Sequence, residues 1–171
     1  LGAAVIGDAR PRDVIARAKR PLIVFGISAM QRSVGAEIVM LADRIGAAIV
    51  AAPMAKGTVP ENHPLFAGTL DMACNELMWS LLGSADLILN VGFDAVELIK
   101  PWKVNSPVIH IDEVPNTDQI YAADIEIIGP LSVALSALCA DIPEQAGFDE
   151  RTLAAHRQEL QASFDSGRVA G

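Results

Sequence analysis

The sequence of 171 residues has few cysteines, few aromatic side chains and no long apolar run. Cys74 and Cys139 are isolated, which gives neither a disulfide framework nor a metal-ligand spacing. No apolar run reaches the roughly 18 residues that a membrane span needs. The N-terminus also lacks the charged-then-apolar order of a signal peptide. These absences predict a cytoplasmic protein without a membrane partner.

Positive charge is scarce as well. Thirteen Lys and Arg residues stand against 21 Asp and Glu, which gives a formal net charge of −8. Such an acidic chain, without a basic cluster, is not expected to bind nucleic acid or an anionic membrane surface. Aliphatic residues are plentiful, because 51% of the chain is hydrophobic and only 5% is aromatic. This length and composition are typical of one compact α/β domain.

Short β-branched apolar runs alternate with segments of helical period. Six strands are predicted at residues 21–25, 47–51, 66–67, 86–91, 107–111 and 125–128. Helices are predicted at 33–45, ended by a left-handed cap at Gly46, at 72–82, and after Pro130. Strands that are apolar throughout must be covered on both faces. The fold class is therefore α/β, with a three-layer, doubly wound, Rossmann-like parallel sheet of about six strands.

The chain divides into three parts. Residues 1–20 read as a lead-in with a short helix between Arg12 and Lys19, and residues 21–140 form the α/β domain. Residues 141–171 read as a polar linker helix with a thin apolar line of Leu153, Leu160 and Phe164. A helix this polar gains little by folding alone, so we expect it to lead toward an absent C-terminal domain.

Candidate ligand-binding residues follow the strands, because open α/β sheets bind ligands outside the carboxyl ends of their strands. Glycines there let backbone N–H groups approach a diphosphate, and a carboxylate can accept from ribose hydroxyls. The candidates are Gly26, Ser28, Met54, Lys56, Gly57, Gly92, Phe93, Asp112, Glu113 and Gly129. The alternative is that these glycines only shape strand-to-helix turns, and that Lys56 is a solvated loop residue.

The stronger motifs are missing. The sequence has no Gly-x-Gly-x-x-Gly and no Walker-type loop, which disfavours a nicotinamide oxidoreductase. Residues 26–30 imitate a nucleophile elbow except that Met30 replaces the last glycine, so Ser28 is not expected to be a nucleophile. We interpret His110 as a core histidine whose hydrogen bonds are satisfied within the fold. We predict neither catalytic residues nor a metal site in this chain.

At these same positions the sequence resembles the central domain of thiamine-diphosphate-dependent enzymes of the acetolactate synthase type. The most specific match is the loop 53–65, with the sequence PMAKGTVPENHPL. Further matches are residues 18–26, 68–70, 85–92, 108–112 and 127–129, in order and over about residues 11 to 140.

The resemblance implies a parent enzyme of three domains that forms a homo-oligomer. The N-terminal domain would supply the glutamate that activates thiamine diphosphate. The C-terminal domain would supply a Gly-Asp-Gly motif that holds the diphosphate through Mg²⁺. This chain has no Gly-Asp-Gly. The implied function is therefore a central structural domain of a 2-keto acid carboligase or decarboxylase, with no complete active site in the fragment.

The resemblance also implies that FAD or ADP can occupy the crevice in some members. Here Gly92-Phe93-Asp94 stands where acetolactate synthases show Gly-Ala-Arg, and Gly129-Pro130 stands where they show Gly-Asp. These departures remove a cationic donor and an N–H, which favours an empty crevice or an ADP-like fragment over FAD. The alternative function is a free-standing nucleotide-binding module of the same fold.

Overall fold

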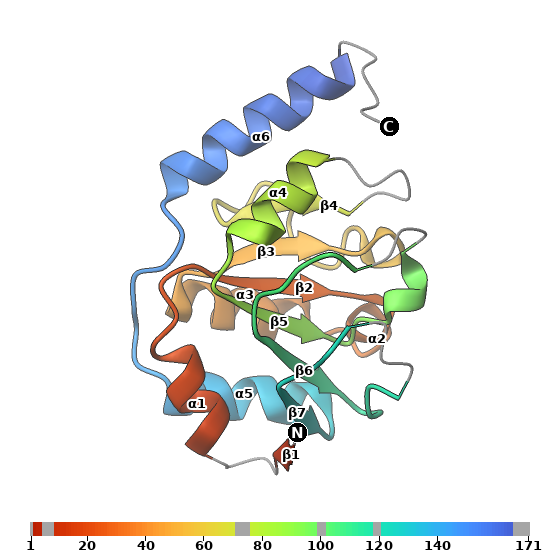
Figure 1. The fold of residues 1–171 in the computed structure, drawn as a ribbon, viewed down its shortest axis with the longest axis vertical. Coiled ribbons are helices and arrows are strands. Elements are labelled where there is room, and N and C mark those ends of the chain that lie inside the picture. The colour runs from red at the N-terminus through yellow and green to blue at the C-terminus, as the bar shows by residue number, and fades with distance from the viewer. Residues whose placement is uncertain (1, 5–8, 71–75, 99–101, 118–120, 166–171) are drawn as a thin grey trace.

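Seven parallel strands form one sheet in the part of the chain that the computed structural model describes, which is residues 2–4, 9–70, 76–98, 102–117 and 121–165. The strands are β1 (Gly2–Ala4), β2 (Pro21–Phe25), β3 (Ala48–Ala51), β4 (Phe66–Thr69), β5 (Leu87–Val91), β6 (Val108–Asp112) and β7 (Ile125–Ile128). Their spatial order is β1-β7-β6-β5-β2-β3-β4 (Figure 1). Counted from β2, this is the 3-2-1-4-5-6 order of a doubly wound sheet, whose direction of winding reverses between β2 and β5.

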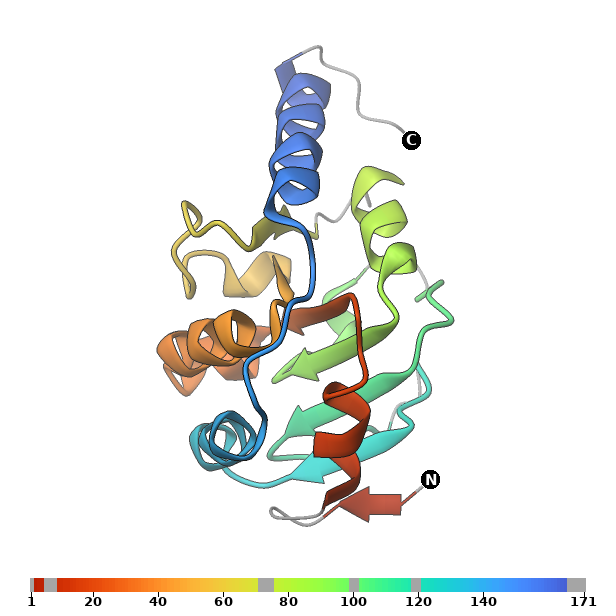
Figure 2. The same ribbon diagram turned by 90° about the vertical axis from the view of Figure 1, so that its left-hand side faces the viewer.

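Helices cover both faces of the sheet. The helices are α1 (Ala9–Ile15), α2 (Ile27–Gln31), α3 (Gly35–Ile45), α4 (Glu76–Ser84), α5 (Leu131–Asp141) and α6 (Glu150–Asp165), with short 3-10 turns η1 (Pro53–Ala55) and η2 (Ala95–Glu97). Helices α3 and α5 lie together on one face, while α1 and α4 lie on the other (Figure 2). The predicted three-layer, Rossmann-like α/β fold is confirmed. None of the described helices is long and apolar enough to cross a membrane.

All six predicted strands are present, and β1 is an additional edge strand that pairs with β7. The helix predicted at 33–45 begins at Gly35, and the separate short helix α2 precedes it. The helix predicted between residues 12 and 19 ends earlier, at Ile15, because the chain turns there before it enters β2. Cys74 and residues 72–75 of another predicted helix lie outside the described residues, while the rest of that helix continues to Ser84.

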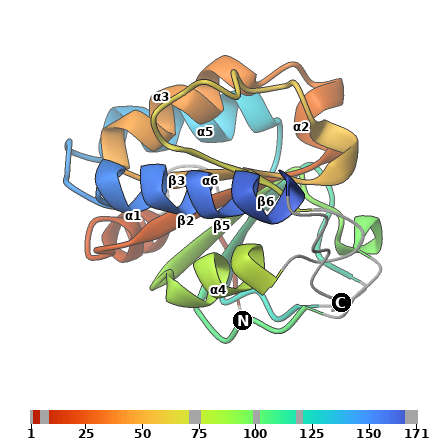
Figure 3. The same ribbon diagram turned by 90° about the horizontal axis from the view of Figure 1, so that it is seen from above.

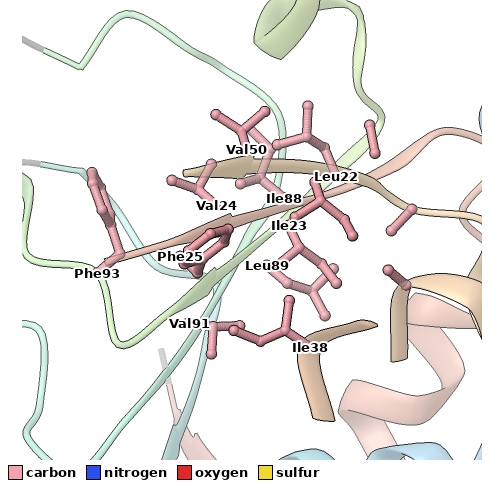
Figure 4. Packing of buried hydrophobic residues seen from close by; sticks show 14 of the residues in the cluster. Leu22, Ile23, Val24, Phe25, Ile38, Val50, Ile88, Leu89, Val91 and Phe93 are labelled. Carbon is pink, nitrogen blue, oxygen red and sulfur yellow. The ribbon is translucent and has the colours of Figure 1, made fainter. Parts of the chain in front are cut away.

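The face under α3 and α5 is aliphatic. Ile38, Leu41 and Ile45 of α3 are fully buried, as their helical spacing predicts. Gly46 adopts the predicted left-handed conformation, with φ of 63°, and ends the helix. Figure 4 shows Leu89 and Val91 of β5 on the side of the sheet that faces Ile38.

The other face carries an aromatic cluster where helices would be expected. The described residues that connect β5 to β6 and β6 to β7 form no α-helix. Instead, Trp102 packs edge-on against Trp79 of α4, with ring centroids 6.0 Å apart, and lies 5.3 Å from the ring of Tyr121. Phe93 packs against both Trp102 and Tyr121. Rings of this size bury enough apolar area to replace a helix over the sheet.

Helix α6 crosses the β4 edge of the sheet (Figure 3). Arg157 donates hydrogen bonds from Nη1 to the carbonyl oxygens of Pro64 and Phe66, at 2.7 and 2.9 Å. Leu153 and Leu160 are buried, whereas Phe164 is exposed. A Cβ at Gly68 would lie 3.0 Å from Leu160, so the glycine allows the helix to approach. The helix thereby protects an edge strand that would otherwise present unpaired backbone groups.

Candidate functional site

A cavity of about 300 Å³ lies at the carboxyl edge of the sheet, where the winding reverses. It is bounded by the turns that follow β2, β5 and β6. Its lining residues are Ile27, Ser28, Phe93, Asp94, His110, Asp112, Val114, Pro115, Asn116 and Thr117. This is the position at which doubly wound folds bind their ligands.

The predicted site residues divide between two places. Ser28, Phe93 and Asp112 line the cavity. Lys56 and Gly57 line a second, shallower hollow of about 380 Å³ between the loop after β3 and the start of α3. The Met54 side chain is exposed near it on η1. The loop after β3 therefore does not reach the first cavity.

The predicted glycines shape the edge rather than line the cavity. Gly92 and Gly129 have positive φ angles of 53° and 157°, which favour glycine. The N–H of Gly92 donates to the Ile111 carbonyl, and that of Gly129 donates to the Asp112 carbonyl. Both glycines thus turn the chain away from the sheet after β5 and β7. Gly26 is tightly enclosed by the turn after β5.

Asp112 is the most buried carboxylate of the cavity, with 4% of its surface exposed. Burial raises its pKa above the ordinary value of 3.8, while the Glu113 N–H donates a hydrogen bond of 2.6 Å to Oδ1 and opposes the shift. Glu113 itself points away and pairs with Arg32 of the segment after α2, near the surface. Only Asp112 of these two predicted residues therefore faces the cavity.

His110 is a buried, fully paired core histidine, as the sequence predicts. Its Nε2 lies 2.9 Å from the Val114 carbonyl oxygen, and its Nδ1 lies 2.8 Å from the Tyr121 hydroxyl. A carbonyl only accepts, so Nε2 carries a proton and, in the neutral ring, Nδ1 accepts from Tyr121. Burial raises the pKa of Tyr121, which keeps that hydroxyl protonated. Both nitrogens are occupied, so His110 is not presented to Ser28 as a base.

Sequence reasoning missed several groups at this edge. Asn116 lines the cavity and donates from Nδ2 to the Tyr121 carbonyl oxygen at 2.9 Å. Glu97 of η2 accepts a hydrogen bond of 3.0 Å from the Ile27 N–H. Both come from irregular segments, where no periodicity marks a side chain as buried. The only available signal was their position shortly after a strand.

The ionisable side chains that line the cavity include two carboxylates. Asp94 and Asp112 give it negative charge, and no Lys or Arg is among its lining residues. The described residues contain no group of three or more His, Cys, Asp or Glu side chains placed to hold a metal ion. The order of the strands and the helices on both faces define the chain as a Rossmann-like domain of the doubly wound class.

Comparisons with known proteins identify the family within that class. The family model described as "Thiamine pyrophosphate enzyme, central domain" matches residues 10–138. The chain therefore belongs to the family of central domains of thiamine pyrophosphate enzymes, as the sequence resemblance indicates.

Individual relatives agree with this assignment. The chain is 28% identical over 131 residues to pyruvate oxidase of Lactiplantibacillus plantarum, covering 75% of this chain and 21% of the relative. It is 27% identical over 122 residues to acetolactate synthase of Bacillus subtilis, covering 68% and 21%. A crystal structure from Mycobacterium smegmatis, described as a thiamin diphosphate-dependent enzyme, has a TM-score of 0.67 at 24% identity and covers 80% and 27%. The chain thus spans roughly a fifth to a quarter of these proteins.

Proposed function

We propose that this chain is the central domain of a thiamine-diphosphate-dependent carboligase or decarboxylase that acts on 2-keto acids. The observation that carries the proposal is the family match over residues 10–138. The relatives include a pyruvate oxidase and acetolactate synthases, whose names state related 2-keto acid chemistry. In this proposal the parent is a cytoplasmic homo-oligomeric enzyme, and this chain alone does not catalyse.

The cofactors of the parent enzyme are thiamine diphosphate and Mg²⁺, held by N- and C-terminal domains that flank this one. The chain's own residues do not fit either group. The sequence has no Gly-Asp-Gly, and the described residues offer no cluster of metal ligands. The role of the chain is therefore to hold and orient its two neighbours. When bound in the parent, thiamine diphosphate supplies the carbanion stabilisation that 2-keto acid chemistry requires.

The finer part of the proposal concerns whether the crevice holds FAD, ADP or no ligand. Asp112 would accept from ribose hydroxyls, and Ser28 would face the sugar or base, because both line the cavity. The acidic lining disfavours a diphosphate at the same place. This balance supports an empty crevice or a small neutral fragment over FAD.

A second candidate function is a free-standing nucleotide-binding module. The observation in its favour is the cavity of about 300 Å³ at the switch point, which is large enough for a small ligand. This candidate predicts ligand binding by the isolated chain without any keto acid chemistry.

The decisive experiment assays CO2 release by the full-length protein with thiamine diphosphate, Mg²⁺ and pyruvate. The matched control is the 171-residue chain alone under the same conditions. We expect turnover by the full-length protein only. Silence across a panel of 2-keto acids would contradict the proposal, and turnover by the isolated chain would contradict the assignment of a purely structural role.

A further inference from the structure

The turn between β2 and α2 uses its first backbone N–H groups within the chain itself. Gly26 donates to the Val91 carbonyl at 3.1 Å, and Ser28 donates to the Gly92 carbonyl at 3.1 Å. Between them, Ile27 donates to Oε1 of Glu97 at 3.0 Å. In dinucleotide-binding folds the N–H groups of this first turn hold the diphosphate. Here the turn after β5 takes that place.

Gly26 shows how closely the two turns approach. A Cβ at this position would lie 2.6 Å from Cα of Phe93 and 2.7 Å from Oε1 of Glu97, distances that real Cβ atoms do not show. A glycine in this turn usually lets a backbone approach a ligand. In this chain the glycine makes room for residues of the same polypeptide.

Glu97 is an unusual group to find there. It reaches the turn from 70 residues away in the sequence, whereas ordinary helix caps come from the residue at the helix start. Its Oε2 is buried and has no hydrogen-bond partner among the described residues. Burial raises the pKa of Glu97, and the hydrogen bond from Ile27 opposes that shift. Glu97 is thus a half-buried carboxylate whose Oε2 atom is enclosed and unpaired, which distinguishes it from a solvent-exposed helix cap.

The other charged side chains at this edge do not offset the negative charge of Glu97. Asp94 and Asp112 line the adjacent cavity. The nearby cation Arg32 is paired with Glu113. A diphosphate would therefore enter a site that already contains carboxylates and offers no free cation among its lining residues.

We infer that this domain closes its crevice to diphosphate nucleotides with an anion of its own. The Glu97 carboxylate accepts the Ile27 N–H that a diphosphate oxygen would need, and it fills the space beside Gly26. The ligand excluded by this arrangement is any nucleoside diphosphate, whether ADP or the ADP portion of FAD. The inference concerns the crevice alone, so it stands apart from the keto acid activity proposed for the parent.

The test titrates the full-length protein with ADP, and separately with inorganic phosphate, by calorimetry. Four proteins are compared: the wild type, Glu97→Ala, Glu97→Gln and Asp94→Asn. Glu97→Ala frees the Ile27 N–H and the space that the carboxylate fills. Glu97→Gln keeps an acceptor oxygen of the same size, and Asp94→Asn is the control that removes an exposed carboxylate from the same edge and leaves the Ile27 N–H paired with Glu97.

We expect no ADP binding by the wild type, Glu97→Gln or Asp94→Asn. Glu97→Ala should bind ADP with an affinity about tenfold or more above the upper limit for the wild type. ADP binding by the wild type that shifts the Ile27 amide resonance would overturn the inference, and so would a Glu97→Ala variant as unresponsive as the wild type. If that variant does not fold, the Ile27 amide resonance of the wild type decides the question. This resonance should shift when one carboxyl group is protonated and should stay unchanged when millimolar ADP is added.

Discussion

The two faces of the sheet are built on different principles. The face under α3 and α5 is filled by aliphatic side chains at regular spacing, such as Leu41 and Leu135. The opposite face, above β5 and β6, is filled by rings from irregular segments and includes buried polar groups. Asn90 and His110 are register partners on neighbouring strands, so their side chains project from the same face. The stability of the aliphatic face depends on the volume that its side chains fill, whereas the stability of the aromatic face also depends on particular hydrogen bonds.

The largest expected effect lies on the aliphatic face. Leu41→Ala should lower the free energy of unfolding by about 2 to 5 kcal/mol, because the fully buried side chain leaves a cavity that the surrounding residues fill only in part. Urea denaturation followed by circular dichroism measures this change. The control is Met40→Ala at the neighbouring position, where 53% of the side chain is exposed. Equal losses in the two variants would contradict the description of this face.

A smaller loss is expected where the aromatic face relies on one hydroxyl. Tyr121→Phe keeps the ring and removes the donor to His110 Nδ1, which lies 2.8 Å from the hydroxyl. Leaving that buried nitrogen unpaired should cost about 1 to 3 kcal/mol of unfolding free energy. Urea denaturation measures the cost, and the ¹⁵N shift of His110 reports the lost bond.

A hydroxyl that is less buried provides the control for Tyr121→Phe. Ser106 donates to the Ala85 carbonyl at 2.7 Å from a half-buried position, whereas Tyr121 is buried. We expect a smaller loss than for Tyr121→Phe. A Tyr121→Phe protein as stable as the wild type would mean that this face, too, depends on volume alone.

The same contrast explains what the sequence could and could not predict. Strands β2 to β7 and the stripe of Ile38, Leu41 and Ile45 were predictable, because burial imposes a period on aliphatic residues. Helix α2 was not, because its five residues are too few to show a period. Glu97 and Tyr121 were missed because their partners lie 70 and 11 residues away, and only the folded sheet brings them together.

The candidate site follows the same rule. Position after a strand was enough to select Ser28, Phe93 and Asp112, which line the cavity. It was not enough to separate these from Lys56 and Gly57, which lie in another hollow. The separation depends on the path of the loop after β3, and a Gly- and Pro-rich loop leaves no periodic trace in the sequence.

The subtlest expected effect is a change in the pH dependence of stability. Burial raises the pKa of Asp112 in the folded state above its ordinary value of 3.8, so the folded state holds this proton more tightly than the unfolded state does. Between those two pKa values the folded state binds more protons, and the unfolding free energy contributed by this group falls as pH rises. Asp112→Asn should remove that part of the slope and should be relatively more stable at neutral pH.

Urea denaturation of wild type and Asp112→Asn at a series of pH values from below 3.8 to neutrality measures the difference in slope. Asp94→Asn controls for the change in net charge, because Asp94 borders the same cavity but is exposed. If burial governs the pKa of Asp112, only Asp112→Asn changes the pH dependence of the unfolding free energy in the predicted direction. A variant whose stability instead falls relative to the wild type as pH rises would show that the Glu113 N–H, at 2.6 Å from Oδ1, outweighs burial. In that case a single hydrogen bond would control the charge on the aromatic face.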